Sequence, residues 1–190
     1  MANMASVAYA IEGSRESLEA IQAAIIIASK DKDHWSEYAA CVKLGFSEEE
    51  LEEKRLGGDA DGDAEIDGKG VLHFWAEERW GLQDFHILLK QKFPDIKVYW
   101  VVEESGCEVY ATNDKKGKYF PERFYVDACI DGEYKTEYFE KEESMYKYIA
   151  DITKNRVKTP KEVEAFNADY EDSEEADENF IYIHKFEVMD

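Results

Sequence analysis

The segment from Phe74 to Asp114 constrains the fold more than any other part of the chain. Apolar and polar residues alternate over residues 96–102, which is typical of a strand with one buried face. A helix is predicted over residues 81–92, and Pro94 ends it because proline disfavours helical geometry in the residue before it. After a turn, residues 107–111 return as an antiparallel strand. The segment therefore predicts strand, helix, strand, turn and strand around one sheet.

The flanking segments extend the same pattern of strands and helices. Residues 6–12 are predicted to form a strand, and Ser14 is placed to cap a helix over residues 15–29. Asp131–Gly132 is a strong hairpin signal between two further strands, and a helix is predicted over residues 141–155. We therefore predict an α+β fold, a ferredoxin-like sandwich, with a mainly antiparallel sheet, two main helices on one face and a small helical insertion.

The length of 190 residues favours one domain over residues 1–190. Within it, residues 31–70 are predicted to be an insertion made of short helices and an acidic loop. Residues 159–178 are acidic and expected to be partly mobile, although apolar residues within them could anchor a short helix. Residues 179–188 are expected to form a C-terminal strand, and its neighbours in the sheet do not follow from the sequence.

The first part of the insertion carries two short predicted helices. Gly45 is placed to end the first helix, and Ser47 with Glu50 forms a capping box at the start of the second. Two short helices around a turn invite a helix-turn-helix interpretation. The second helix is rich in glutamate, however, and a recognition helix must approach phosphates. A helical cover over one sheet edge is the better prediction.

The second part of the insertion, residues 57–70, resembles a calcium loop because aspartates alternate from Asp59 onward. The EF-hand pattern requires glycine at position 6 and glutamate at position 12, and this chain has Ala64 and Gly70 there. We therefore expect a flexible acidic loop, with weak divalent-cation binding by the segment from Asp59 to Asp67 as the alternative.

The charge balance limits the classes of partner. Acidic residues outnumber basic ones by 44 to 23, which gives a formal charge of −21. Such a surface repels phosphate backbones and attracts cationic partners, so we expect a basic protein partner and no nucleic acid. Oligomeric state is not predictable from these features.

The cysteines and the apolar segments indicate the compartment. The three cysteines are widely spaced and form no CxxC pair, as expected for reduced thiols. The most apolar run, residues 20–28, is far shorter than the about 20 residues that a membrane span needs. The N-terminal residues lack the features of a signal peptide. The sequence predicts a cytoplasmic protein without membrane attachment.

No motif of a known catalytic or cofactor site occurs in the chain. Phosphate-binding loops, dinucleotide-binding glycine patterns, zinc-binding histidine pairs and nucleophile elbows are all missing from the sequence. We therefore expect no cofactor, no catalytic residue and no metal ligand. The alternative from another class is a small hydrolase or metal-dependent enzyme that uses the strand-end carboxylates Glu77, Glu78, Glu103 or Glu104 with a histidine.

Aromatic residues are concentrated on the predicted sheet. Tyr and Trp are residue types that anchor protein interfaces. If several tyrosines share the second face of the sheet, they form a shallow aromatic surface, although packing in the core is the plainer interpretation. The residues predicted to contact a partner are Tyr99, Tyr110, Tyr125, Trp80, Glu103 and Glu104.

The central segment also resembles a known family. The residues that carry this resemblance are Trp80, Phe85, Leu88–Leu89, Phe93–Pro94–Asp95 and Glu104–Gly106. They resemble the YubB-like ferredoxin-like domain family, which occurs in plasmids, phages and bacterial genomes and whose function is unknown. The resemblance implies a bacterial protein with an α+β sheet and helices on one side. It implies no catalytic residues.

These observations together predict a non-catalytic cytoplasmic interaction module with a strongly acidic surface. Two sharper forms of this hypothesis are a DNA mimic and an immunity-type inhibitor, both of which would occupy a basic partner. The hydrolase or metal-dependent enzyme described above is the alternative.

Overall fold

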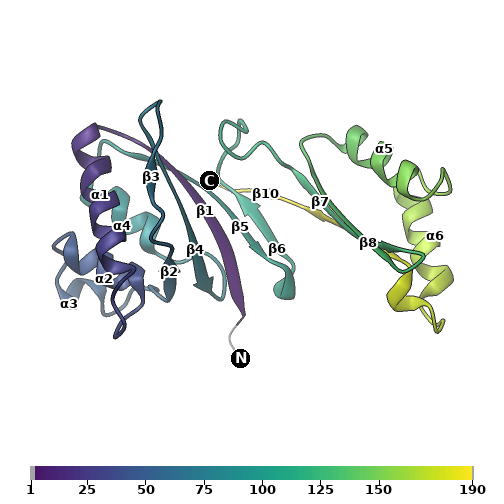
Figure 1. Ribbon diagram of the computed structural model, residues 1–190, viewed down its shortest axis with the longest axis horizontal. Coiled ribbons are helices and arrows are strands. Elements are labelled where there is room, and N and C mark those ends of the chain that lie inside the picture. Colours follow the sequence, from purple (N-terminus) through teal and green to yellow (C-terminus); the bar gives the residue numbers. More distant parts are fainter. Residues whose placement is uncertain (1–2, 190) are drawn as a thin grey trace. The chain divides into compact units, whose positions relative to one another are not determined.

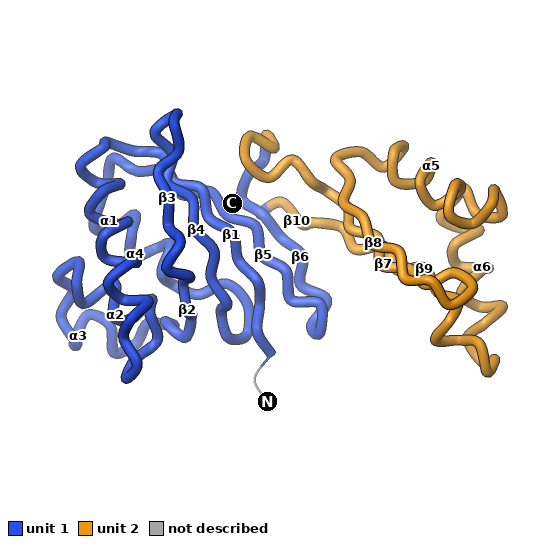
Figure 2. The backbone as a smooth tube through the Cα atoms, in the orientation of Figure 1, with its two compact units in different colours: residues 1–115, 189–190 blue, residues 116–188 orange. Residues whose placement is uncertain are grey.

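A computed structural model describes residues 3–189, and the chain forms two compact units (Figure 2). Unit 1 contains Met1–Lys115 together with Met189–Asp190, and unit 2 contains Lys116–Val188. Each unit has its own cluster of buried apolar side chains. The chain thus forms two compact units, and the single domain over residues 1–190 stays a prediction.

Unit 1 is an antiparallel sheet with helices on one face (Figure 1). Its strands are β1 (Met4–Glu12), β2 (Gly58–Ala60), β3 (Glu65–Ile66), β4 (Val71–Arg79), β5 (Lys97–Glu104) and β6 (Val109–Thr112). Its helices are α1 (Arg15–Ala28), α2 (Ser36–Lys43), α3 (Glu48–Leu51) and α4 (Phe85–Lys92), with a 3-10 turn at Ser105–Cys107. The strand order is β6-β5-β1-β4-β2, and β3 also pairs with β4.

Strand β1 lies at the centre of unit 1, between β4 and β5. Its alternating side chains Val7, Tyr9 and Ile11 are buried on the side that the helices cover. Helix α1 packs its apolar stripe over them, and Ser14 caps this helix by accepting a hydrogen bond from the Ser17 amide. The core of unit 1 is therefore a layer between one sheet face and the helices.

The insertion contains the two helices that the sequence predicts, and it also contains strands that the sequence did not predict. Gly45 has a φ of +87°, and Ser47 and Glu50 form the predicted capping box. Helix α3 is a single turn that ends at Leu51. In place of one continuous flexible loop over residues 57–70, β2 and β3 both pair with β4. Backbone hydrogen bonds to β4 explain this difference.

Unit 2 is a three-stranded antiparallel sheet with two helices on one face (Figure 1). Its elements are β7 (Phe124–Ile130), β8 (Glu133–Phe139), α5 (Glu142–Ile152), α6 (Pro160–Tyr170), a 3-10 turn (Ala176–Glu178) and β9 (Phe180–Lys185). A two-residue strand, β10 (Glu187–Val188), follows. The strand order is β8-β7-β9, so β9 pairs with β7. The structure thereby places the C-terminal strand that the sequence left unplaced.

Local sequence signals explain the hairpin between β7 and β8 and the start of α6 in unit 2. Asp131 and Gly132 both have positive φ, 52° and 80°, as the tight hairpin between β7 and β8 requires. Thr159 caps α6, and Val163 and Phe166 bury its apolar side. Much of the acidic segment 159–178 is therefore helical. The prediction of an α+β fold with mainly antiparallel sheets is confirmed.

Within the described residues 3–189, no helix is both long and apolar enough to cross a membrane.

The two separate cores lead to a prediction about unfolding. All four tryptophans lie in unit 1, so tryptophan fluorescence reports unit 1 alone, whereas far-UV circular dichroism reports both units. Ile149 is fully buried in unit 2, and Ile149→Ala is expected to lower the free energy of unfolding by about 2–5 kcal/mol. Denaturant titration should show this loss by circular dichroism and leave the fluorescence transition unchanged.

The matched variant is Ile25→Ala, which truncates a fully buried isoleucine of unit 1. It should shift the fluorescence transition by a similar amount. Equal shifts of both signals in both variants would contradict independent cores.

Candidate functional site

Two carboxyl groups of unit 1 meet inside the core. Glu37 comes from α2 and Glu78 from β4, and both residues are 0% exposed. The Tyr9 hydroxyl donates a hydrogen bond to Oε1 of Glu78, and the backbone amide of Gln83 donates one to Oε2. The Glu37 carboxyl lies beside the Glu78 carboxyl within hydrogen-bonding reach. We call Tyr9, Glu37 and Glu78 the buried acid cluster.

The local sequence explains how both glutamates reach the core. Residues alternate across β4, so Glu78 lies on the same inward face as Phe74 and Ala76. Glu37 lies in the first turn of α2, four residues before buried Cys41, and therefore on the same side of that helix. Gly58 leaves space for the Glu37 carboxyl, because a side chain at Gly58 would collide with it.

The cluster has too few donors for two ionised carboxylates. Neither oxygen of Glu37 accepts a well-formed hydrogen bond; the Gly58 amide lies close to it without that geometry. Burial raises the pKa of Glu37 well above its ordinary value, and the Glu78 charge raises it further. Burial also raises the pKa of Glu78, against the donors that favour its charged form. Of the two carboxyl groups, Glu37 therefore has the stronger tendency to hold a proton.

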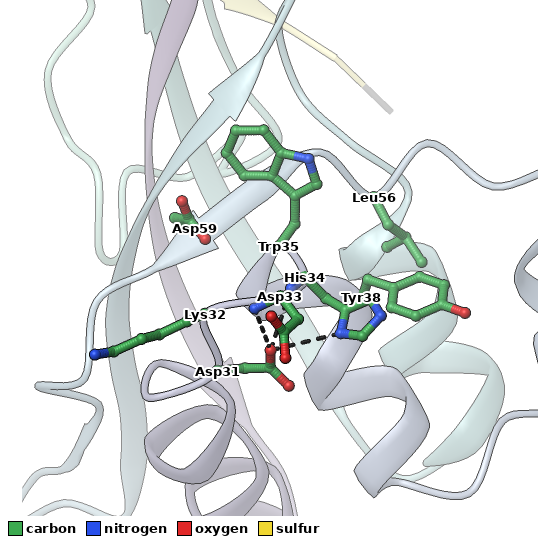
Figure 3. A pocket seen from close by; sticks show the side chains of 8 residues that line it. All are labelled: Asp31, Lys32, Asp33, His34, Trp35, Tyr38, Leu56 and Asp59. Atoms are coloured by element: carbon green, nitrogen blue, oxygen red, sulfur yellow. Dashed lines mark hydrogen bonds and ion pairs between the residues drawn. The ribbon is translucent and has the colours of Figure 1, made fainter.

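Unit 1 also contains a pocket, whose lining side chains Figure 3 shows. Its cavity volume of about 520 Å³ lies in the range of small-ligand sites. It lies where the loop after α1 meets the start of α2 and β2. The lining residues are Asp31, Lys32, Asp33, His34, Trp35, Tyr38, Leu56 and Asp59.

The pocket combines carboxylates with aromatic rings. The Asp31 carboxylate accepts hydrogen bonds from the amides of Asp33 and His34 at 2.9 and 3.1 Å, and these bonds lower its pKa, that of Asp33 most. It also faces the His34 ring, as Figure 3 shows. The rings of His34 and Tyr38 stack with centroids 5.5 Å apart. The Trp35 side chain, at 36% exposed, forms another wall.

Ser36 joins the pocket to the buried acid cluster. Its backbone amide donates to Asp59 Oδ1 at 3.0 Å, and its hydroxyl accepts a hydrogen bond from the Ala60 amide at 2.6 Å. These bonds fix the first turn of α2 to β2. The next residue is Glu37, so the same turn carries a pocket wall on one side and the buried carboxyl on the other.

The structure places the sequence-predicted partner residues at several different positions. Tyr99, Glu103 and Tyr110 lie on the sheet face of unit 1 that the helices leave uncovered, with Glu103 paired opposite Tyr110. Trp80 lies in the turn after β4 and is 61% exposed, whereas Tyr110 is buried. Tyr125 belongs to β7 in unit 2. Tyr99 and Tyr110 therefore belong to one sheet and Tyr125 to another, so the condition for a shared tyrosine surface on one sheet is not met.

The strand-end carboxylates also separate. Glu78 and Glu104 point to the helix-covered face and are buried, whereas Glu77 and Glu103 occupy the alternate, opposite face. The four therefore do not converge. Sequence reasoning missed Glu37, which the structure brings to Glu78. The signal for it was an acidic residue on the otherwise apolar stripe of α2.

The acidic residues of the β2–β3 region stabilise the backbone. The Asp67 carboxylate accepts hydrogen bonds from the amides of Lys69 and Val71, each at 2.9 Å. Asp61 accepts one from the Trp75 amide at 3.4 Å. Across residues 3–189, no three or more histidine, cysteine or acidic side chains are grouped so that they could hold a metal ion.

Comparison of the chain with protein-family models, with curated proteins and with solved structures gave no match.

The hydrogen bond from Tyr9 to Glu78 leads to a prediction about stability. Tyr9→Phe removes the hydroxyl donor and leaves a buried carboxylate oxygen without it. We expect the free energy of unfolding of unit 1 to fall by about 1–3 kcal/mol. Denaturant titration followed by tryptophan fluorescence measures this change.

Tyr134→Phe is the control, because Tyr134 lies in unit 2 and is 72% exposed. It should leave the same transition unchanged. A Tyr9→Phe protein as stable as the wild type would show that the buried hydrogen bond contributes nothing.

Proposed function

We propose that this chain is a non-catalytic interaction module, and that the pocket of unit 1 receives a cationic side chain of a basic partner protein. The single observation that carries the proposal is the pairing of aromatic walls with carboxylates in one pocket of a chain with a formal charge of −21. Carboxylates attract a guanidinium or ammonium group, and aromatic faces contact its apolar and cationic surfaces.

The electrostatics of the pocket favour a cation over an anion. Three aspartates, Asp31, Asp33 and Asp59, line it against one lysine, Lys32. The Asp31 charge is held in place by its hydrogen bonds to the backbone. A phosphate or carboxylate ligand would be repelled by the net negative charge of the pocket. A cation would be attracted by the carboxylates and could also contact the aromatic rings.

An intramolecular contact supports the same chemistry at one wall. The Arg79 guanidinium lies over the Trp35 ring at 5.4 Å and over the Trp80 ring at 4.5 Å from the centroids. Trp35 thus already contacts one guanidinium through its face. A partner arginine at the pocket would make the same type of contact.

A shallow cleft continues from the pocket along α2. It shares Asp31, His34 and Tyr38 with the pocket and adds side chains that include Val42 and Glu48. Val42 is 43% exposed. The continuation would accommodate neighbouring residues of a partner segment, one apolar and one basic.

Several finer expectations are part of the same proposal. We propose a ferredoxin-like arrangement for the helix-covered sheet and retain the YubB-like resemblance as the proposed family. Three free thiols, Cys41, Cys107 and Cys129, support a reducing compartment, so we propose the cytoplasm. A DNA mimic and an immunity-type inhibitor are specific forms of this function that differ in the identity of the basic partner.

The pocket is tested with the double variant Asp33→Asn/Trp35→Ala and a fluorescent arginine-rich peptide as the probe. Fluorescence anisotropy should show that the full-length wild-type chain binds the peptide and that the variant binds about tenfold more weakly, which corresponds to about 1.4 kcal/mol. Because the attraction is between charges, raising the salt concentration should weaken wild-type binding.

The matched control is Glu174→Gln/Tyr134→Ala, which removes one exposed acid and one exposed tyrosine from unit 2. It should bind the peptide as the wild type does. Equal weakening by both double variants would assign binding to general acidity and exclude the pocket. No binding by the wild type at low salt would refute the function itself.

A further inference from the structure

The buried acid cluster requires a proton to be stable as it is arranged. Glu78 already accepts hydrogen bonds from the Tyr9 hydroxyl and the Gln83 amide, whereas Glu37 has no well-formed donor. Two adjacent carboxylates that are both ionised repel each other strongly in the core. One proton on Glu37 removes the repulsion and supplies the hydrogen bond that joins α2 to β4.

The surroundings of the pair decide which glutamate holds that proton. Groups that face it come from every neighbouring element: Tyr9 of β1, Cys41 of α2, Asp59 of β2 and Arg55 of the α3–β2 loop. Glu104 of β5 lies on the same sheet face, near Gly81. The Arg55 charge acts on Glu78, and the Asp59 charge acts on Glu37.

Two of the neighbours, Cys41 and Tyr9, keep their protons across ordinary pH. Burial raises the pKa of the Cys41 thiol to about 12. Burial and the two glutamates raise the pKa of Tyr9 well above its usual value. Neither of these two groups therefore supplies the proton change that is proposed for Glu37.

Loss of that proton would act on the pocket through α2. The first turn of α2 is fixed from outside by the bond between the Ser36 amide and Asp59 and from inside by the contact of Glu37 with Glu78. Trp35 and Tyr38 flank this turn and line the pocket. An ionised Glu37 would be driven toward water, and the helix start would move with it.

We propose that Glu37 and Glu78 form a proton-operated latch, which holds the start of α2 on the sheet while one proton is shared and releases it when that proton passes to solvent. When both carboxyl groups are ionised, their repulsion drives Glu37 toward water, so α2 loosens and the pocket loses its shape. The effect of the latch on the pocket rests on the proposed function, whereas the pairing of Glu37 with Glu78 does not.

The direction of the pH effect follows from proton binding. The folded chain holds one more proton than the unfolded chain between the ordinary glutamate pKa and the raised pKa of the folded pair. Stability from the latch is complete below this window and falls as the pH rises through it. Within the window, the equilibrium constant for folding falls by up to about tenfold per pH unit.

Glu37→Gln tests the latch, because glutamine donates a hydrogen bond to Glu78 without titrating. The unfolding midpoint of unit 1, followed by tryptophan fluorescence without ligand, is measured from about pH 5 to about pH 8.5. The wild-type midpoint should fall with pH relative to that of the variant. Glu49→Gln is the control, since Glu49 is exposed on α3, and it should follow the wild type.

Two further measurements keep the test independent of whether the variant folds. Infrared spectroscopy of the wild type near neutral pH should show the band of a protonated, buried carboxyl group, and alkaline pH should remove it. Amide hydrogen exchange of α2, compared with that of α1 in the same sample, should accelerate more as the pH rises. Absence of the band, or equal pH dependence of the wild type and Glu37→Gln, would overturn the latch.

Peptide binding separates the two proposals. If the latch and the pocket are both real, the wild type binds the arginine-rich peptide less well at about pH 8.5 than at about pH 6, and Glu37→Gln shows a smaller loss. A positive infrared result with no peptide binding would refute the pocket alone. Peptide binding with an ordinary, ionised Glu37 would refute the latch alone.

Discussion

The antiparallel pairing of β1 with β4 and β5 is the constraint on which the rest of unit 1 depends. Its register runs from Met4 opposite Arg79 to Glu12 opposite Val71. Since side chains alternate across a strand, a slip by one residue would turn Tyr9 and the core away from the helices. The same register sets Glu78 inward, at the level where α2 crosses the sheet. Core packing and the buried acid cluster therefore have one common origin.

Burial of two glutamates is tolerated because the pair need not carry two charges. A protonated Glu37 is a neutral hydrogen-bond donor, and the remaining charge on Glu78 is met by the Tyr9 hydroxyl and the Gln83 amide. The protein as a whole, at a formal charge of −21, also favours retention of a proton at any carboxyl group. The acidic surface and the burial of the pair therefore both favour retention of a proton by Glu37.

The sequence predicted those parts of the fold that depend on neighbouring residues. The Ser14 cap, the Ser47–Glu50 capping box and the Asp131–Gly132 hairpin each involve only a few adjacent residues, and the structure contains all of them. The division into two sheets could not be derived in that way. It depends on β9 pairing with β7 across more than forty residues of sequence, and no proline- or glycine-rich linker marks the boundary near Lys116.

The site escaped prediction for a related reason. In a chain with 44 acidic residues, a carboxylate is informative only when the fold withdraws it from water, and exposure is a property of the tertiary structure. Glu77 and Glu78 are adjacent residues of the same type, yet Glu77 is exposed and Glu78 lies in the core. Glu37 is 41 positions from its partner and could have been found only as an acid on an apolar helix stripe. The start of α2 thus carries that acid in the core, and the neighbouring residues Trp35 and Tyr38 line the pocket.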